Sequence, residues 1–152
     1  GEYPRRVSAT GGQYLEKDGR DIPDTFLLTA DYPSEWSLFL VSTLTNDAGL
    51  PDRIYGKYGT MELGGEPSLR WNGDFKEEFK AKNDGKEEVR LPIKPRRDLE
   101  GNFIDVLRGK DTLACNADLG CATMITIKMA VESFRQSKTL LWDAKDEKVK
   151  TA

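Results

Sequence analysis

The chain has 152 residues, of which 38% are hydrophobic and 32% are charged, a composition typical of a soluble globular domain. Its 23 basic and 26 acidic residues give a net charge of −3, and the absence of a basic stripe argues against a nucleic-acid partner. No segment approaches the ~20 apolar residues that a membrane-spanning helix needs. The first residues, 1–6, are also not followed by the apolar core of a signal peptide.

The first half of the sequence predicts short strands separated by turn residues. A hairpin is expected over residues 14–22, because Asp18-Gly19 is a strong turn dipeptide. Residues 25–32 and 36–43 are joined by a short turn at Pro33, which predicts an antiparallel pair. Further strands are expected at 7–10, 53–56, 58–63 and 69–71.

The strand over residues 36–43 is apolar on both of its faces. Trp36, Leu38 and Leu40 alternate with Phe39 and Val41, so the two sets point to opposite sides of the sheet. We therefore expect both faces of this sheet to be covered.

The second half of the sequence begins with a charged segment and continues with residues that predict helices. Residues 72–90 are dense in charged residues and predict a solvated loop or an exposed edge strand, followed by a strand over 87–93. Apolar residues then recur at helical spacing from Leu99 to Leu107, with Gly109 as a stop signal.

A longer helix is expected from Asn116, a good N-cap residue, to about Gln136. It carries two apolar stripes, so we expect it to be buried against more than one layer. Their members are Met124, Ile127, Val131 and Phe134 on one side, and Leu119, Ala122, Ile125 and Met129 on the other. Residues 139–142 predict a closing strand before a charged tail. Strands first and helices after predict an α+β fold: a large antiparallel or mixed open sheet with helices on one face.

No residue pattern in the chain predicts an active site. Histidine is absent, which excludes Ser-His-Asp, Cys-His and histidine–metal chemistry within this chain. Asp18, Asp21 and Asp24 lack the ligand spacing of a calcium loop and are interpreted as turn residues. Cys115 and Cys121 are interpreted as reduced thiols, with a disulfide or a redox role as the alternative.

Four stretches of the sequence, taken in order, resemble a known family. They are residues 3–12 (YPRRVSATGG) with DGR at 18–20 and PDT at 23–25, residues 32–47 from YP to STLTND, residues 54–63 (IYGKYGTMEL), and residues 102–143 from NFIDVLRG through CNADLG to LWD. Together they are similar to the carboxy-terminal domain of the Gfo/Idh/MocA oxidoreductases, which include glucose–fructose oxidoreductase and inositol dehydrogenase. Each motif is weak alone, whereas their collinear order covers nearly the whole chain.

The resemblance implies that residues 1–152 form a substrate-binding and dimerising domain whose partner is an upstream Rossmann domain holding NAD or NADP. The family's catalytic Lys, Asp and His lie upstream of the matched part, so this chain has no catalytic residue, binds no cofactor itself and is inactive alone. The full protein would act on a sugar, sugar derivative or cyclitol.

The resemblance also implies two places of substrate contact. The loop after the second long strand maps to Asn46, Asp47 and Ala48, and the segment before the first helix maps to Arg96 and Arg97. An amide and a carboxylate suit vicinal hydroxyls, because each forms directed hydrogen bonds. The alternative is an ordinary loop cap and a basic strand end. Many relatives carry a His where this chain has Leu99, so the substrate is not carried over.

The strand over residues 36–43, which is apolar on both faces, also predicts that the domain forms a dimer. Two helices cannot cover both sides of the sheet, so a second copy across a twofold axis would cover the other face and form a homodimer. A cytoplasmic location is the default, because no framework of paired cysteines is present. The alternatives are a stand-alone carbohydrate-binding or protein-interaction module and a non-catalytic dimer scaffold.

Overall fold

The structure is a computed structural model that describes residues 1–93 and 98–152. Its described part forms two compact units, residues 1–48 with 102–152 and residues 49–101. Each unit contains one antiparallel sheet, of five and four strands respectively. The α+β class and the antiparallel pairing are thus confirmed. The expected single large sheet is instead two, because no described pairing joins β3 (Ser37–Thr43), at the edge of one sheet, to β4 (Arg53–Tyr55), at the edge of the other.

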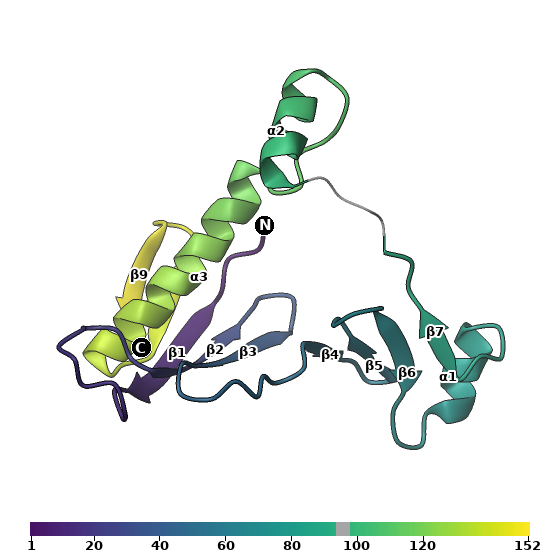
Figure 1. The fold of residues 1–152 in the computed structure, drawn as a ribbon, viewed down its shortest axis with the longest axis horizontal. Coiled ribbons are helices and arrows are strands. Elements are labelled where there is room, and N and C mark those ends of the chain that lie inside the picture. The colour runs from purple at the N-terminus through teal and green to yellow at the C-terminus, as the bar shows by residue number, and fades with distance from the viewer. Residues whose placement is uncertain (94–97) are drawn as a thin grey trace. The chain divides into compact units, whose positions relative to one another are not determined.

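The five-stranded sheet has the order β3-β2-β1-β8-β9. Its strands are β1 (Arg6–Gly12), β2 (Thr25–Asp31), β3, β8 (Leu140–Asp143) and β9 (Lys148–Thr151). The long helix α3 (Ala117–Gln136) lies along β1 and β8 on one face (Figure 1). The core of this unit consists of Val7, Leu28, Ala30, Tyr32, Met129, Ala130 and Leu140.

Helix α3 begins with the expected cap and ends at Gln136, as expected. The side chain of Asn116 caps the N-terminus by accepting a hydrogen bond of 2.9 Å from the backbone N–H of Leu119. The stripe with Ala122 and Met129 is the better covered of the two, because these residues are buried whereas Met124 and Ile127 of the other stripe are exposed. Phe134 of that other stripe still contacts Phe26 of β2. Among the described residues, the helix therefore has one covering layer, the sheet, rather than the two that were expected.

Strand β3 alternates as expected, but the face of the sheet opposite α3 is less apolar than expected. Leu38 and Leu40 lie on the α3 side, opposite Ala30 and Leu28. On the free face, Phe39 pairs with Thr29 and Val41 with Leu27, while β1 contributes Ser8 and Thr10. Phe39, Val41 and Leu27 therefore form an apolar strip among hydroxyls, and Leu141 of β8 lies on the same face beside Arg6. Phe39 is 63% exposed.

The second unit consists of a four-stranded sheet and a short helix. Its strands are β4, β5 (Gly59–Glu62), β6 (Ser68–Trp71) and β7 (Glu88–Arg90), in that order, with α1 (Lys76–Lys82) between the last two in sequence. Phe79 of α1 is buried, and a Cβ at Gly59 would lie 3.2 Å from its ring. Gly59 therefore makes room for the aromatic ring that anchors the helix. Cross-strand ion pairs join Arg53 to Glu62 and Arg70 to Glu88.

Three predicted segments differ from the structure. Residues 72–90 were expected as a loop or edge strand but contain α1, because Phe79 is buried and the charges of the segment suit the helix ends. Residues 14–22 are an irregular loop rather than a hairpin. The charged tail forms β9, which pairs with β8 and ties Lys150 to Asp143.

Helix α2 (Leu99–Leu107) is followed by Gly109 with a positive φ of 69°, as the stop signal predicts. Asn102 of this helix is buried, and its side chain holds the connecting segment between α2 and α3 by hydrogen bonds. Its amide donates to Asp111 Oδ2 (2.7 Å) and to the Thr112 carbonyl, and its Oδ1 accepts from the Ala114 N–H. None of the helices in the two described ranges is long and apolar enough to cross a bilayer.

The two methionines of α3 provide a matched test of its orientation. Met129→Ala should lower the free energy of unfolding by about 2–5 kcal/mol, because a fully buried side chain leaves a cavity. Met124→Ala on the exposed side should change it by less than about 0.5 kcal/mol. Urea denaturation followed by circular dichroism measures both, and equal losses would contradict the assigned buried face.

Candidate functional site

One end of the five-stranded sheet carries two loops rich in polar side chains. Strand β1 ends at Gly12, which pairs with Thr25 at the start of β2, and Thr25 pairs with Thr43 at the end of β3. Residues 13–24 and the chain after Thr43 therefore leave the sheet at the same end of these strands. A Cβ at Gly11 would lie 2.0 Å from the carbonyl oxygen of Thr25, so only glycine permits this close approach.

Asp24 organises both loops. Its Oδ2 accepts hydrogen bonds from the backbone N–H groups of Tyr14 (2.7 Å), Leu15 (2.8 Å) and Glu16 (3.2 Å). Its own N–H donates to the Gly12 carbonyl, and its carbonyl accepts from the N–H of Leu44. The side chain is 1% exposed. The backbone donors, that of Leu15 first, hold the pKa of this carboxyl below its ordinary value.

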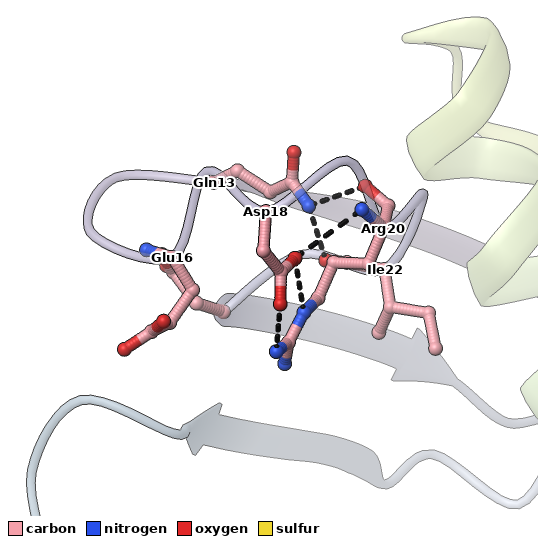
Figure 2. A network of polar contacts seen from close by, with 6 residues as sticks. Gln13, Glu16, Asp18, Arg20 and Ile22 are labelled. Atoms are coloured by element: carbon pink, nitrogen blue, oxygen red, sulfur yellow. Dashed lines mark hydrogen bonds and ion pairs between the residues drawn. The ribbon is translucent and has the colours of Figure 1, made fainter.

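The first loop carries a second set of polar contacts, which Figure 2 shows. The Gln13 amide donates to the carbonyl oxygens of Arg20 and Ile22. The Asp18 carboxylate accepts from the Arg20 guanidinium, with 2.7 Å from Nε to Oδ1. This pairing lowers the pKa of Asp18 to about 2. Side-chain groups and backbone carbonyls are thus paired within the loop, which restrains its shape.

The predicted substrate residues of the second loop are exposed. Asn46 Oδ1 accepts a hydrogen bond of 2.7 Å from the Ala48 N–H, so its carboxamide oxygen caps a turn. Among the described residues the Asn46 amide nitrogen and the Asp47 carboxylate have no hydrogen-bond partner, which leaves them available for hydroxyl groups. Arg96 and Arg97, the other two predicted contacts, lie outside the described residues.

A depression of about 390 Å³ lies on the free face of the same sheet. Its polar groups are paired with one another: Arg6 Nε donates to Asp31 Oδ2 (2.8 Å) and Ser37 Oγ donates to Asp31 Oδ1 (2.7 Å). The hydroxyl of Ser37 and then the guanidinium of Arg6 hold the pKa of Asp31 below its ordinary value. Because these groups are already satisfied, the depression has few free donors or acceptors for a ligand.

Sequence reasoning identified Asp24 only as one of three turn carboxylates and missed its role as the link between the loops. The three carboxylates do not converge, since Asp18 pairs with Arg20 and Asp21 lies near Arg135. Across residues 1–93 and 98–152, no group of three His, Cys, Asp or Glu side chains is placed to hold a metal ion. Cys115 and Cys121 are free and exposed, as expected.

The fold matches solved structures of oxidoreductases. A putative oxidoreductase from Thermotoga maritima matches with a TM-score of 0.68 and 18% identity, covering 92% of this chain and 41% of that one. An NAD-binding protein from Listeria innocua matches with a TM-score of 0.63 and 16% identity, covering 92% and 46%. An aldose–aldose oxidoreductase from Caulobacter crescentus matches with a TM-score of 0.60 and 17% identity, covering 92% and 42%. No protein-family model and no curated protein matches the chain.

The chain has the fold of one part of these oxidoreductases. It spans less than half of the length of the structures that it matches. The resemblance predicted from the sequence, to the carboxy-terminal domain of oxidoreductases of this kind, is confirmed at the level of the fold. At these sequence identities the likeness establishes the arrangement of the chain, and the chemistry is argued separately below.

The lowered pKa of Asp24 predicts a specific dependence of stability on pH. Its contribution is fully present above the ordinary aspartate value, about 4, and is lost as the pH falls from there toward the lowered pKa. Asp24→Asn keeps the shape but not the charge, so it should lower the melting temperature at pH 7. Thermal melts between pH 7 and pH 3 should show the difference between the two proteins shrinking with acid. A constant difference would contradict this role of the Asp24 charge.

Proposed function

We propose that residues 1–152 are the carboxy-terminal domain of an NAD- or NADP-dependent oxidoreductase that acts on a sugar, sugar derivative or cyclitol. The observation that supports this most is that 92% of the chain follows the fold of oxidoreductases about twice its length. One of these is by name an NAD-binding protein and another an aldose–aldose oxidoreductase. The cofactor and the hydride chemistry would belong to a Rossmann domain upstream of this chain.

The role of this domain is to supply one wall of the substrate site. Loops carried by a rigid sheet suit this role, because the scaffold fixes where their side chains point. Asp24 holds the loop over residues 13–23 and the start of the next loop at one sheet end. Asn46 and Asp47 follow directly and would bind hydroxyl groups of the substrate. Arg96 and Arg97 remain a second proposed contact.

The second role of the domain is to form a homodimer through the free face of the five-stranded sheet. Phe39, Val41 and Leu27 form its apolar strip, and the flanking hydroxyls offer donors and acceptors to a second copy. A twofold axis through such a patch places the apolar strips of the two copies opposite each other, and the charges of Arg6 and Asp31 beside it are already paired within each copy. The cytoplasm is the proposed location.

Nicotinamide binding tests the assignment of the domain. The natural protein with the residues that precede Gly1 should bind NAD(H) or NADP(H) in calorimetry, whereas residues 1–152 alone should bind neither. Nicotinamide binding to the isolated chain would contradict the assignment, and failure of the longer protein to bind either cofactor would favour a stand-alone binding module.

Substitutions at Asn46 separate substrate contact from turn capping. Asn46→Asp keeps the acceptor for the Ala48 N–H but removes the amide donor, so in the longer enzyme it should raise KM for the sugar about tenfold, the effect of one lost hydrogen bond. Asp47→Ala should act similarly, with the Kd for the cofactor unchanged in both. Asp52→Ala, an exposed carboxylate of the same connecting segment, is the matched control. Unchanged KM values in all variants would show that this loop does not contact the substrate.

A single charge on the free face tests the dimer. Phe39→Lys should convert a dimer to a monomer in analytical ultracentrifugation at micromolar concentration, because it places two like charges near the twofold axis. Leu15→Lys, in the loop over residues 13–23, should leave the dimer intact. A wild-type protein that sediments as a monomer would contradict the proposal.

A further inference from the structure

We propose that Lys57 and Lys82, which both lie over the ring of Tyr58 in the four-stranded unit, form a binding site for a phosphate monoester. This inference goes beyond the proposed function and does not depend on it, because every residue involved belongs to the unit over residues 49–101.

One aromatic ring brings the two ammonium groups together. The Nζ atom of Lys82 lies 4.2 Å from the centre of the Tyr58 ring, and the Nζ atom of Lys57 lies 5.2 Å from it. Lys57 Nζ also lies 5.8 Å from the centre of the Phe75 ring, which meets Tyr58 edge-on with the centroids 5.3 Å apart. Because a cation is attracted to an aromatic face, the rings restrain two side chains that would otherwise move freely.

The hairpin tip that carries Lys57 and Tyr58 is fixed to the segment before α1. The backbone N–H of Asn72 donates to the Tyr58 carbonyl (3.2 Å), and its side-chain amide donates to the Gly56 carbonyl (2.9 Å). Its Oδ1 accepts from the Thr60 hydroxyl (2.7 Å). The lysine of the tip and the lysine of the helix are therefore positioned before a ligand arrives, which lowers the entropy lost on binding.

The positive charges of these two lysines are not neutralised by carboxylates. Two other lysines of α1, Lys76 and Lys80, both pair with Glu87 at 2.9 Å. Within residues 1–93 and 98–152, no ion pair engages Lys57 or Lys82. Two like charges beside one ring repel each other, so an anion that contacts both relieves this repulsion.

The charge of the site favours a phosphate monoester over a carboxylate. A phosphate monoester carries a charge of about −1.5 to −2 at pH 7 and has three acceptor oxygens, so it can neutralise both ammonium groups at once. A single carboxylate carries half of the charge needed. Lysine binds phosphate as a compact point charge. Both lysines are exposed and Tyr58 is 37% exposed, so the site is open to a ligand from solvent.

An NMR titration of the 152-residue chain with glycerol phosphate tests the proposal. At constant ionic strength and pH 7, the backbone amide signals of Lys57, Tyr58 and Lys82 should shift together and saturate, and acetate should bind at least about tenfold more weakly. Lys57→Gln and Lys82→Gln should each raise the Kd for glycerol phosphate about tenfold, the effect of one lost hydrogen bond to a charged group. Lys86→Gln, at an exposed lysine of the same unit, is the matched control and should leave the Kd unchanged.

Tyr58→Leu distinguishes a positioned pair of lysines from surface charge alone. It keeps both ammonium groups but removes the ring that holds them, so it should raise the Kd about fivefold. Unchanged amide signals of β6 and β7 would show that the sheet is intact in this variant. Shifts that do not saturate, that acetate reproduces at the same concentration, or that survive in Lys57→Gln and Lys82→Gln would reflect charge screening and overturn the proposal. An unchanged Kd in Tyr58→Leu would overturn the role of the ring.

Discussion

The contact between α3 and the strands β1 and β8 determines what the rest of the larger unit can do. Val7 and Leu140 sit opposite each other in the register and are covered by Met129 of the helix, with all three side chains buried. One helix about 10 Å wide covers roughly two strands of a five-stranded sheet. The edge strand β3 is consequently exposed at Leu40 on one face and at Phe39 on the other.

The two faces of β3 differ in chemistry. On the α3 side, Leu40 lies opposite the buried Leu28 and is 41% exposed. The opposite face carries Phe39, Val41 and Leu27 together with hydroxyls and the Arg6–Asp31 pair. A mixed surface of this kind is typical of a wet interface, which is what the proposed dimer requires.

The sequence predicted those parts of the fold that local signals determine. Residues that are close in sequence determine three such features, and the structure confirms each: the cap at Asn116, the stop at Gly109 and the alternation along β3. Long-range contacts were missed. The Asp18-Gly19 dipeptide suggested a hairpin, but the Asp24 carboxylate takes the N–H groups of residues 14–16 that a strand ladder would need.

The same limit applies to the helices and to the candidate site. Helix α1 depends on burial of the single aromatic ring of Phe79, which no periodicity reveals. Periodicity showed two apolar stripes on α3, but it could not show that the sheet covers one of them far more than the other among the described residues. Asn46 and Asp47 came from a resemblance, and the structure adds that Asp24 anchors the start of their loop.

Hydrogen exchange along α3 is the most direct measurement of whether residues 1–152 are one domain of a longer oxidoreductase, as proposed above. Backbone amides of α3 should exchange more slowly in the longer natural protein than in residues 1–152 alone, because contact with a preceding domain stabilises the whole unit. Equal exchange rates in the two proteins would contradict the account.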